Sequence, residues 1–348
     1  MKAMRLHDVG VFTLDNVEKP MPKGNEILIK VNACGICGSD IPRVYELGTR
    51  VYPVTLGHEF SGTVCEVGNE EDKKLIGKKV AIFPIIPCKK CVNCQTGNYA
   101  QCENYQYLGS RNDGGFAEYC LVPSRWHLIF SNNIETSIED LALVEPATVA
   151  QHAIRKSNLR AGENIVIIGA GPIGILAARW AKIFGANDII LMEIDKVKID
   201  FAKKLGLNVV DVNDSECIEF IKMKMKNINV VIEGTGTTSG INNAIELVST
   251  FGRIVMMGNP HKDTQIKLQN HSLILRKEIN LIGIWNSYYV DFPFNEWKYT
   301  VKSIDDKILK VDDLITHKSS LLNLKSMFDK IYNKEISICK AIYSDNIL

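Results

Sequence analysis

Four cysteines crowd into one short segment of this chain, where they could hold a metal ion. They are Cys88, Cys91, Cys94 and Cys102, with the spacing Cys-x2-Cys-x2-Cys-x7-Cys. Short Cys-x2-Cys steps let thiolates converge from one tight loop, and the longer return supplies the fourth corner of a tetrahedron. Because four thiolates fill the coordination sphere of zinc, the sequence predicts a structural zinc ion here.

An iron–sulfur cluster and free thiols are the two alternatives to structural zinc. The bacterial ferredoxin pattern has three residues before its last cysteine and a proline after it. This chain has seven residues before Cys102, and Glu103 follows it. The spacing therefore favours zinc over a cluster.

A second metal site would draw its ligands from distant fragments of the chain. The fragments are Cys34-Gly-Ile-Cys37-Gly-Ser39-Asp40, Gly57-His58-Glu59 and Glu145-Pro146. Catalytic zinc typically has three protein ligands of mixed type and one open position for water or substrate. Cys37, His58 and a carboxylate would make such a set. Cys34 and Cys37 could instead form a thioredoxin-like redox pair, but the βαβ context of that pair is missing.

A glycine-rich turn from Gly169 to Gly174 follows an apolar strand pattern and opens a helical pattern. A GxGxxG match alone is a weak signal, and an apolar βα unit without a ligand is the alternative. The strand, the helix and an acidic residue after the next strand supply the context that dinucleotide binding requires. Gly169 permits the tight turn, Gly171 lets the pyrophosphate approach, and Gly174 lets helix and strand pack closely. Pro172 and Ile173 open the helix, whose amino end offers amides to the phosphates.

The acidic residue is Glu193, which lies 24 residues after Gly169. A carboxylate at this place would accept hydrogen bonds from the adenosine ribose hydroxyls and would repel a 2′-phosphate. The sequence therefore predicts NAD rather than NADP. Lys198 could lie along the ribose edge, or it could be a solvated helix lysine.

The secondary-structure pattern changes twice along the chain. Up to about residue 145, short β-prone runs alternate with Gly, Pro and Asn turns. From residue 163, strand and helix patterns alternate, which predicts a parallel sheet covered on both faces. After residue 283 the pattern becomes irregular and aromatic, as expected if the chain returns to the first domain. The predicted fold is α/β: a β-rich domain of residues 1–149 and 286–348 and a doubly wound domain of residues 150–285.

Composition argues against several classes of protein. The 348 residues suggest two domains, and 41 Lys and Arg against 40 Asp and Glu leave no excess charge for nucleic acid or an anionic membrane. The most apolar stretch, residues 165–178, is too short to span a bilayer, and the amino terminus lacks the apolar core of a signal peptide. Ten cysteines without such a signal favour thiolates over disulfides. The sequence predicts a soluble cytoplasmic enzyme.

In this order, the cysteine, histidine and glycine motifs resemble the zinc-dependent medium-chain dehydrogenase/reductase family over essentially the whole chain. Four runs are similar to the bacterial members that oxidise a phosphorylated hexitol. These runs are Cys37–Arg43, Tyr52–Gly62, Gly109–Tyr119 and Leu275–Glu278. The resemblance implies a GroES-like catalytic domain, with a structural-zinc lobe near residues 85–105, interrupted by a Rossmann NAD-binding domain. It also implies a homodimer or homotetramer that acts on a small-molecule polyol phosphate.

The resemblance further implies roles for individual residues. Cys37, His58 and Glu145 would be ligands of the catalytic zinc, and Glu59 would be close enough to compete with Glu145 for the third position. Zinc would lower the pKa of the substrate hydroxyl. Ser39 would pass the hydroxyl proton outward while the substrate delivers hydride to the nicotinamide, although it could also be a turn residue.

Two arginines are expected to bind the substrate phosphate. Arg43 lies six positions after Cys37, where related sorbitol dehydrogenases have a tyrosine that contacts the polyol. A guanidinium at this position offers a bidentate fork for two phosphate oxygens. Arg111 is expected as a second anchor, and each arginine could equally be a surface residue.

Several other functions are compatible with the sequence. Related enzymes would oxidise sorbitol, xylitol, butanediol or threonine, or reduce a pentulose phosphate. A zinc-free reductase of the same fold would need neither Cys37 nor His58. A zinc ribbon that contacts nucleic acid is the alternative from another class, but the neutral charge and the glycine loop both oppose it.

Overall fold

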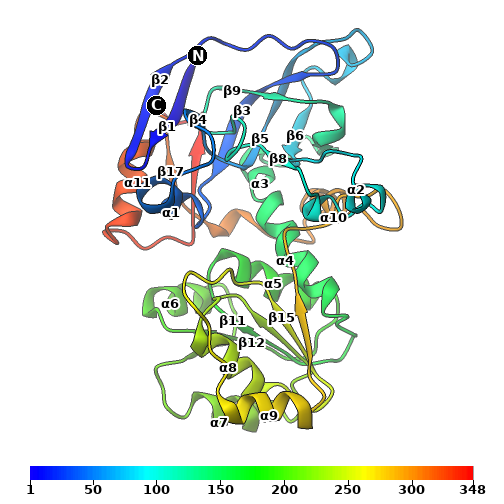
Figure 1. Ribbon diagram of the computed structural model, residues 1–348, viewed down its shortest axis with the longest axis vertical. Coiled ribbons are helices and arrows are strands. Elements are labelled where there is room, and N and C mark those ends of the chain that lie inside the picture. Colours follow the sequence, from blue (N-terminus) through cyan, green and yellow to red (C-terminus); the bar gives the residue numbers. More distant parts are fainter. Residues whose placement is uncertain (348) are drawn as a thin grey trace. The chain divides into compact units, whose positions relative to one another are not determined.

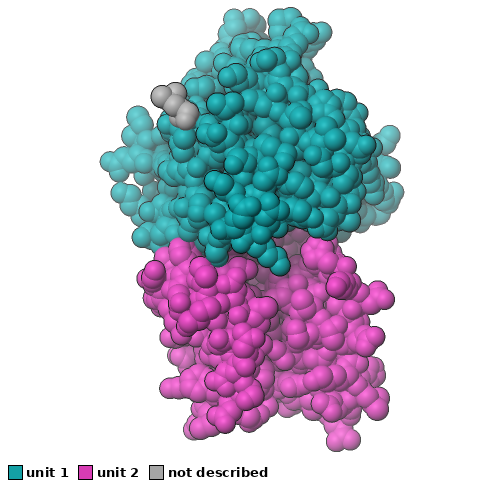
Figure 2. Space-filling view, turned by 90° about the vertical axis from the view of Figure 1, so that its left-hand side faces the viewer, with its two compact units in different colours: residues 1–145, 288–348 teal, residues 146–287 magenta. Residues whose placement is uncertain are grey.

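The computed structural model of the protein describes residues 1–347, which form two compact units. Unit 1 contains residues 1–145 and the chain from Tyr288 onward, and unit 2 contains residues 146–287 (Figure 2). The boundaries expected from the sequence, 149/150 and 285/286, differ from these by four and two residues. The first difference arises because helix α4 (Val144–Lys156) begins in unit 1 and continues into unit 2.

Unit 1 is built around a seven-stranded sheet in which strands distant in the sequence lie side by side. Its main path is β10 (Leu128–Phe130), β6 (Lys79–Ile82), β5 (Glu59–Val67), β3 (Ile27–Gly35), β18 (Lys340–Ser344) and β17 (Ile315–Ser319), and β9 (Tyr119–Val122) also pairs with β3. Strand β3 is antiparallel to both β5 and β18. The last strand of the chain therefore lies next to one of the first.

A smaller sheet and several short elements complete unit 1. The three-stranded sheet has the order β2 (Val11–Asn16), β1 (Lys2–Asp8), β4 (Val54–Thr55), and β7 (Ile85–Ile86) pairs with β8 (Gln106–Tyr107). The α-helices are α1 (Asp40–Pro42), α2 (Val92–Gln95), α3 (Ile138–Ala142), α10 (Glu296–Asp305) and α11 (Leu324–Tyr332). Short 3-10 or π turns cover Arg43–Leu47, Lys73–Leu75, Tyr99–Gln101, Arg125–His127 and Asp312–Leu314.

Aromatic rings pack helix α11 into the core of unit 1. The ring of Phe328 on α11 lies 5.0 Å from that of Phe12 and 5.7 Å from that of Phe116, and all three rings are buried. Such ring pairs stabilise a core by about 0.5–1.5 kcal/mol beyond the burial of their area. The same buried cluster contains residues of β3 and β5, the strands next to the predicted catalytic residues.

Unit 2 contains a six-stranded parallel sheet (Figure 1). Its order is β13 (Val209–Asp211), β12 (Ile189–Glu193), β11 (Ile165–Ile168), β14 (Val230–Glu233), β15 (Arg253–Met256) and β16 (Asn280–Gly283). Strands β11, β12 and β13 follow one another toward one edge of the sheet. Strand β14 then lies on the other side of β11, and β15 and β16 continue toward the opposite edge. This is the doubly wound topology, in which ligands bind where the strand order reverses. The predicted α/β class and parallel sheet are confirmed.

Helices cover both faces of this sheet, as the apolar strands require. They are α5 (Pro172–Ile183), α6 (Lys196–Lys204), α7 (Cys217–Lys224), α8 (Thr238–Leu247) and α9 (Leu268–Arg276). Val166 and Ile168 pack with residues of α7, α8 and α9, while Ile165 and Ile167, which point to the other face, are equally buried. Within the described part of the chain, none of the helices combines the length and apolar character that a membrane span needs.

Candidate functional site

The four-cysteine segment brings its sulfur atoms together around one point. Sγ of Cys88 lies 3.9 Å from Sγ of Cys94, and Sγ of Cys91 lies 3.9 Å from Sγ of Cys102. Bonds of about 2.3 Å from zinc to sulfur would put tetrahedral sulfurs about 3.8 Å apart. All four sulfurs lie within 4.8 Å of one another, so the residues fit a zinc ion.

Backbone amides favour the thiolate form at two of these cysteines. The amide of Cys91 donates to Sγ of Cys88, and this bond together with one from Lys90 lowers the pKa of the Cys88 thiol to about 6. Amides of Glu103 and Cys94 likewise lower the pKa of Cys91. Since metals bind the thiolate, these two positions favour a cation, whereas burial raises the pKa of the Cys94 thiol.

A second group of potential metal ligands forms at the ends of two paired strands. Cys37 follows β3, and His58 precedes Glu59, the first residue of β5. Gly35 of β3 is the partner of Glu59 in the antiparallel register, which brings the two strand ends together. One ligand atom from each of Cys37, His58 and Glu59 lies within 4.8 Å of the others.

Glu145 is a further carboxylate near Cys37, His58 and Glu59. It is not one of the residues whose ligand atoms all lie within 4.8 Å of one another. It is the second residue of α4, it is buried, and its Oε1 accepts a hydrogen bond of 3.4 Å from the hydroxyl of Tyr107. Burial is the main cause that raises its pKa to about 7, and the carboxylate of Glu59 adds to the shift while His58 opposes it. The geometry thus places Glu59 nearer to Cys37 and His58, with Glu145 as a neighbouring carboxylate.

Asp40, which the sequence analysis left without a role, organises this group. It is fully buried, and its Oδ2 accepts a hydrogen bond of 3.1 Å from the amide of Cys37. Its Oδ1 lies 3.6 Å from Nδ1 of His58 and accepts a hydrogen bond of 2.6 Å from Nη1 of Arg43. Asp40 therefore orients Cys37 through the backbone amide of that cysteine, and it faces the ring of His58.

The two arginines and the serine singled out in the sequence have different environments. One nitrogen of Arg43 is engaged by Asp40, and its side chain is 22% exposed. Ser39 is exposed, and its hydroxyl donates to Sγ of Cys37 at 3.3 Å, so it can link this sulfur to solvent. Nη1 of Arg111 donates to the carbonyl oxygen of Tyr105 at 2.5 Å, and the guanidinium stacks on the Tyr105 ring. One nitrogen of Arg111 is thus engaged by its own loop, as one nitrogen of Arg43 is engaged by Asp40.

A lysine from the last strand was not anticipated from the sequence. Lys340 is 3% exposed, its Nζ donates to the carbonyl oxygen of Ile36 at 3.0 Å, and it forms an ion pair with Oε2 of Glu59. Burial alone would lower the pKa of Lys340. The negative charges of Glu59 and Cys37 have the larger, opposite effect, so the pKa is raised. The ammonium therefore carries its charge inside the protein.

The glycine loop of unit 2 has the geometry that its sequence suggests. Gly169 has a φ of +107°, which favours glycine, and its amide donates to the carbonyl oxygen of Met192. A Cβ on Gly174 would collide with the carbonyl oxygen of Gly169, whereas a Cβ on Gly171 would meet no atom within 4 Å. Pro172 and Ile173 form the first turn of α5, for which Gly171 is the N-cap. The loop thus leaves open space beside the helix amino end.

Glu193 lies at the carboxyl end of β12 and is already hydrogen-bonded to the backbone. Its Oε2 accepts from the amide of Ala170 at 2.9 Å, and its Oε1 accepts from the amides of Ile194 and Asp195. The carboxylate is thereby held next to the glycine loop, with lone pairs left for other donors. Lys198, in the first turn of α6, is half-buried.

A second carboxylate at the same edge of the sheet was missed in the sequence. Glu233 ends β14, and its Oε1 accepts from the amide of Thr235 at 2.8 Å and from that of Gly236 at 3.1 Å. A Cβ on Gly258, after β15, would collide with the amide nitrogen of Gly236. These loops flank the point where the strand order reverses, next to the glycine loop.

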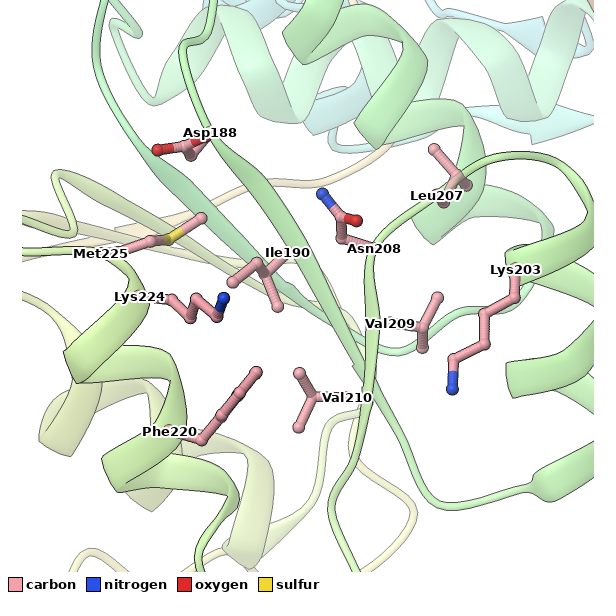
Figure 3. Close-up of a pocket in the computed structure, with 10 residues that line it drawn as sticks. All are labelled: Asp188, Ile190, Lys203, Leu207, Asn208, Val209, Val210, Phe220, Lys224 and Met225. Atoms are coloured by element: carbon pink, nitrogen blue, oxygen red, sulfur yellow. The ribbon is translucent and has the colours of Figure 1, made fainter.

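The cavity drawn in Figure 3 is separate from both groups. It has a volume of about 410 Å³ and lies in unit 2 between β12, β13, α6 and α7. Its walls include Ile190, Phe220 and Met225, with the ammonium groups of Lys203 and Lys224 (Figure 3). It contains no cysteine, no histidine and no residue of the glycine loop.

Two protein families match parts of the chain. The family described as alcohol dehydrogenase GroES-like domain matches residues 23–131. The family described as zinc-binding dehydrogenase matches residues 172–306. The first match contains the four-cysteine segment, Cys37 and His58, and the second begins within the glycine loop.

Individual proteins match over most of the chain. Galactitol 1-phosphate 5-dehydrogenase of Escherichia coli (strain K12) is 34% identical over 300 residues, which are 85% of this chain and 86% of that protein. Sorbitol dehydrogenase of Bacillus subtilis (strain 168) is 32% identical over 293 residues, which are 82% of each chain. The crystal structure of galactitol-1-phosphate dehydrogenase from Escherichia coli aligns with a TM-score of 0.91 and 30% identity, covering 99% of this chain and 100% of that chain.

Proposed function

Because this chain belongs to the zinc-dependent medium-chain dehydrogenase/reductase family, we propose that it oxidises galactitol 1-phosphate to tagatose 6-phosphate. Membership of this family means that the chain is an oxidoreductase that acts on CH–OH groups, with zinc and NAD as cofactors. The finer proposal concerns the substrate. It is supported by the 34% identity to galactitol 1-phosphate 5-dehydrogenase and by the guanidinium of Arg43 beside Asp40.

The proposed catalytic metal ligands are Cys37, His58 and a carboxylate from Glu59 or Glu145. The observation that carries this proposal is the convergence of Cys37, His58 and Glu59 within 4.8 Å. Zinc held there supplies a Lewis acid that lowers the pKa of the substrate hydroxyl. Oδ1 of Asp40 lies 3.6 Å from Nδ1 of His58, on the side of the ring where a carboxylate commonly accompanies a metal-ligating histidine.

The proposed reaction removes a proton and a hydride from one carbon–oxygen unit of the substrate. The hydroxyl proton leaves toward solvent through Ser39, whose exposed hydroxyl contacts Sγ of Cys37. NAD would supply the oxidant: it would accept the hydrogen of the same carbon with both bonding electrons, which would give NADH and a ketone. Tyr107 lies beside the same group: its hydroxyl donates a 3.4 Å hydrogen bond to Glu145, and its ring lies 5.6 Å from that of His58.

The proposed NAD site is the carboxyl edge of the sheet in unit 2. The pyrophosphate would approach Gly169, Gly171 and the helix amino end formed by Pro172, Ile173 and Gly174. Glu193 would accept hydrogen bonds from the ribose hydroxyls and disfavour NADP, with Lys198 along the ribose edge. The four cysteines would hold the structural zinc, and the assembly would be a homodimer or homotetramer.

A second candidate is the oxidation of an unphosphorylated polyol such as sorbitol. The observation that favours it is the 32% identity to sorbitol dehydrogenase over 82% of this chain.

One experiment separates the two candidates. NADH formation is measured with galactitol 1-phosphate, galactitol and sorbitol, before and after treatment with a chelator. We expect the largest kcat/KM with galactitol 1-phosphate and a loss of all activity on chelation. A larger kcat/KM with sorbitol would replace the first candidate by the second, and full activity after metal removal would argue against zinc catalysis altogether.

A further inference from the structure

Three adjacent strands of unit 1 bring the side chains of Lys340 and Glu59 together across a glycine. Glu59 begins β5, Gly35 ends β3, and Lys340 begins β18, and β3 lies between the other two strands. A Cβ on Gly35 would collide with Oε2 of Glu59 and would lie 2.8 Å from Cε of Lys340. The lysine therefore crosses the middle strand at the one position where that strand has no side chain.

Burying this ammonium is costly, and two groups contact it directly among the residues that the structure describes. They are the carbonyl oxygen of Ile36 and the carboxylate of Glu59. Both partners of the ion pair have side chains that are at most 4% exposed. A buried ion pair is often no more stable than well-packed apolar residues of the same volume. Fold stability alone therefore does not account for a lysine at this position.

The ion pair of Lys340 and Glu59 adjoins the potential metal ligands, which suggests a role for the lysine in metal binding. Glu59 is one of the three residues whose ligand atoms converge, and Lys340 binds one oxygen of its carboxylate. A thiolate at Cys37 and carboxylates at Glu59 and Glu145 would together exceed the charge of a divalent ion by one negative charge. Lys340 supplies the positive charge that balances this excess.

We propose that Lys340 is a positioning residue, which restrains Glu59 so that this carboxylate can offer a metal one oxygen at most. The proposal rests on the catalytic-zinc part of the proposed function but not on the identity of the substrate. With Lys340 in place, one coordination position stays available for the substrate hydroxyl. Without it, the released carboxylate can bind the metal with both oxygens and occupy that position.

The test is the variant Lys340→Met with cobalt exchanged for zinc, because cobalt absorption reports the number of ligands. A difference spectrum against Cys37→Ser isolates this site from the four-cysteine segment. We expect the d–d bands of Lys340→Met to weaken, as they do when a fifth ligand binds. We also expect release of this metal to a chelator to become about tenfold slower, since a nearby positive charge has been removed.

Two further variants separate positioning from a structural role. Lys340→Arg keeps the charge and should restore the wild-type spectrum and release rate. Gly35→Ala displaces the ion pair without changing either partner and should reproduce the spectrum of Lys340→Met, so the proposal stays testable if Lys340→Met does not fold. Lys318→Met is the matched control, because Lys318 on β17 is also paired with a glutamate, Glu139, but is 43% exposed.

A double variant decides the mechanism. In a Glu59→Gln background, Lys340→Met should change neither the cobalt spectrum nor the release rate further. An undiminished effect of Lys340→Met in that background would overturn the proposal, and so would unchanged spectra and release rates in both Lys340→Met and Gly35→Ala. If the wild-type protein binds cobalt only at the four cysteines, the catalytic-zinc premise fails and this inference fails with it. Failure with galactitol 1-phosphate alone would change only the substrate.

Discussion

Arg43 and Asp40 are joined by a 2.6 Å contact between Nη1 and Oδ1, and the same oxygen faces Nδ1 of His58 at 3.6 Å. One carboxylate oxygen thus links a potential phosphate anchor to a potential metal ligand. Because a guanidinium has five N–H donors, the bond to Asp40 leaves others for a phosphate. Asp40 would hold the guanidinium in a fixed orientation for that purpose.

The first prediction tests Arg43 as the phosphate anchor. Arg43→Ala should raise the KM for galactitol 1-phosphate about 10- to 100-fold, because hydrogen bonds to charged groups contribute about 1.5–3 kcal/mol. The KM for galactitol should change little, since it has no phosphate. Arg111→Ala tests the second expected anchor, and we expect a smaller rise in the KM for galactitol 1-phosphate, because this guanidinium also stacks on the ring of Tyr105. Steady-state kinetics with both substrates measures this, and an equal rise for both would exclude Arg43 as the anchor.

The second prediction concerns the four cysteines. Cys88→Ser should lower the zinc content from two ions per chain to one, as expected from the two ligand groups of the described residues. It should also lower the temperature of unfolding, because structural zinc contributes directly to folding. The chains that remain folded should keep most of their kcat. Metal analysis and calorimetry measure these changes.

Cys65→Ser is the matched control for this variant, because Cys65 on β5 lies outside both ligand groups. It should retain two zinc ions and the wild-type unfolding temperature. Iron and its visible absorption in the wild-type protein, lost in Cys88→Ser, would instead establish a cluster at the four cysteines.

The third prediction compares two glycines of the same loop. Gly174→Ala should destabilise the fold by about 1–3 kcal/mol, because its Cβ would collide with the backbone at Gly169. Gly171→Ala should fold normally, since its Cβ meets no atom within 4 Å, but it should bind NAD at least tenfold more weakly. Denaturant unfolding and NAD titration by fluorescence distinguish the two effects. Normal NAD affinity in Gly171→Ala would show that the pyrophosphate lies elsewhere.

The fourth prediction concerns the pH dependence of the chelator-treated protein. Burial is the chief cause that raises the pKa of Glu145 from 4.5 to about 7. The folded chain therefore keeps a proton that the unfolded chain loses, and the free energy of unfolding falls as the pH rises from about 4.5 to about 7. Glu145→Gln cannot titrate and should lack this contribution. Urea unfolding of both proteins at several pH values measures the difference, and parallel pH profiles would contradict the prediction.

Local motifs made the glycine loop and the four-cysteine segment predictable from the sequence. Gly169 to Gly174 lie between a strand and the helix that follows it, so their geometry depends on neighbouring residues. The cysteine segment likewise closes on itself within fifteen residues, from Cys88 to Cys102. In both cases the spacing along the chain already limits the positions of the side chains.

The residues that the sequence did not indicate depend on strand order instead. Lys340 meets Glu59 only because β18 lies beside β3, and no local pattern shows that pairing. A single lysine in the otherwise apolar run from Ile338 to Tyr343 was the available signal. Arg111 was expected to face the substrate, and its contact with Tyr105 follows from a loop conformation that its spacing does not specify.

The place of β18 in the central sheet has a consequence for the order in which the protein is made. During synthesis, residues 146–287 can complete their sheet while unit 1 still lacks β17 and β18. Until residue 340 has left the ribosome, residues 33–35 of β3 lack a partner strand on one side, and Glu59 has no ammonium beside it. A nascent or truncated chain can therefore possess the complete parallel sheet of unit 2 while unit 1 still lacks the strand that brings Lys340 to Glu59.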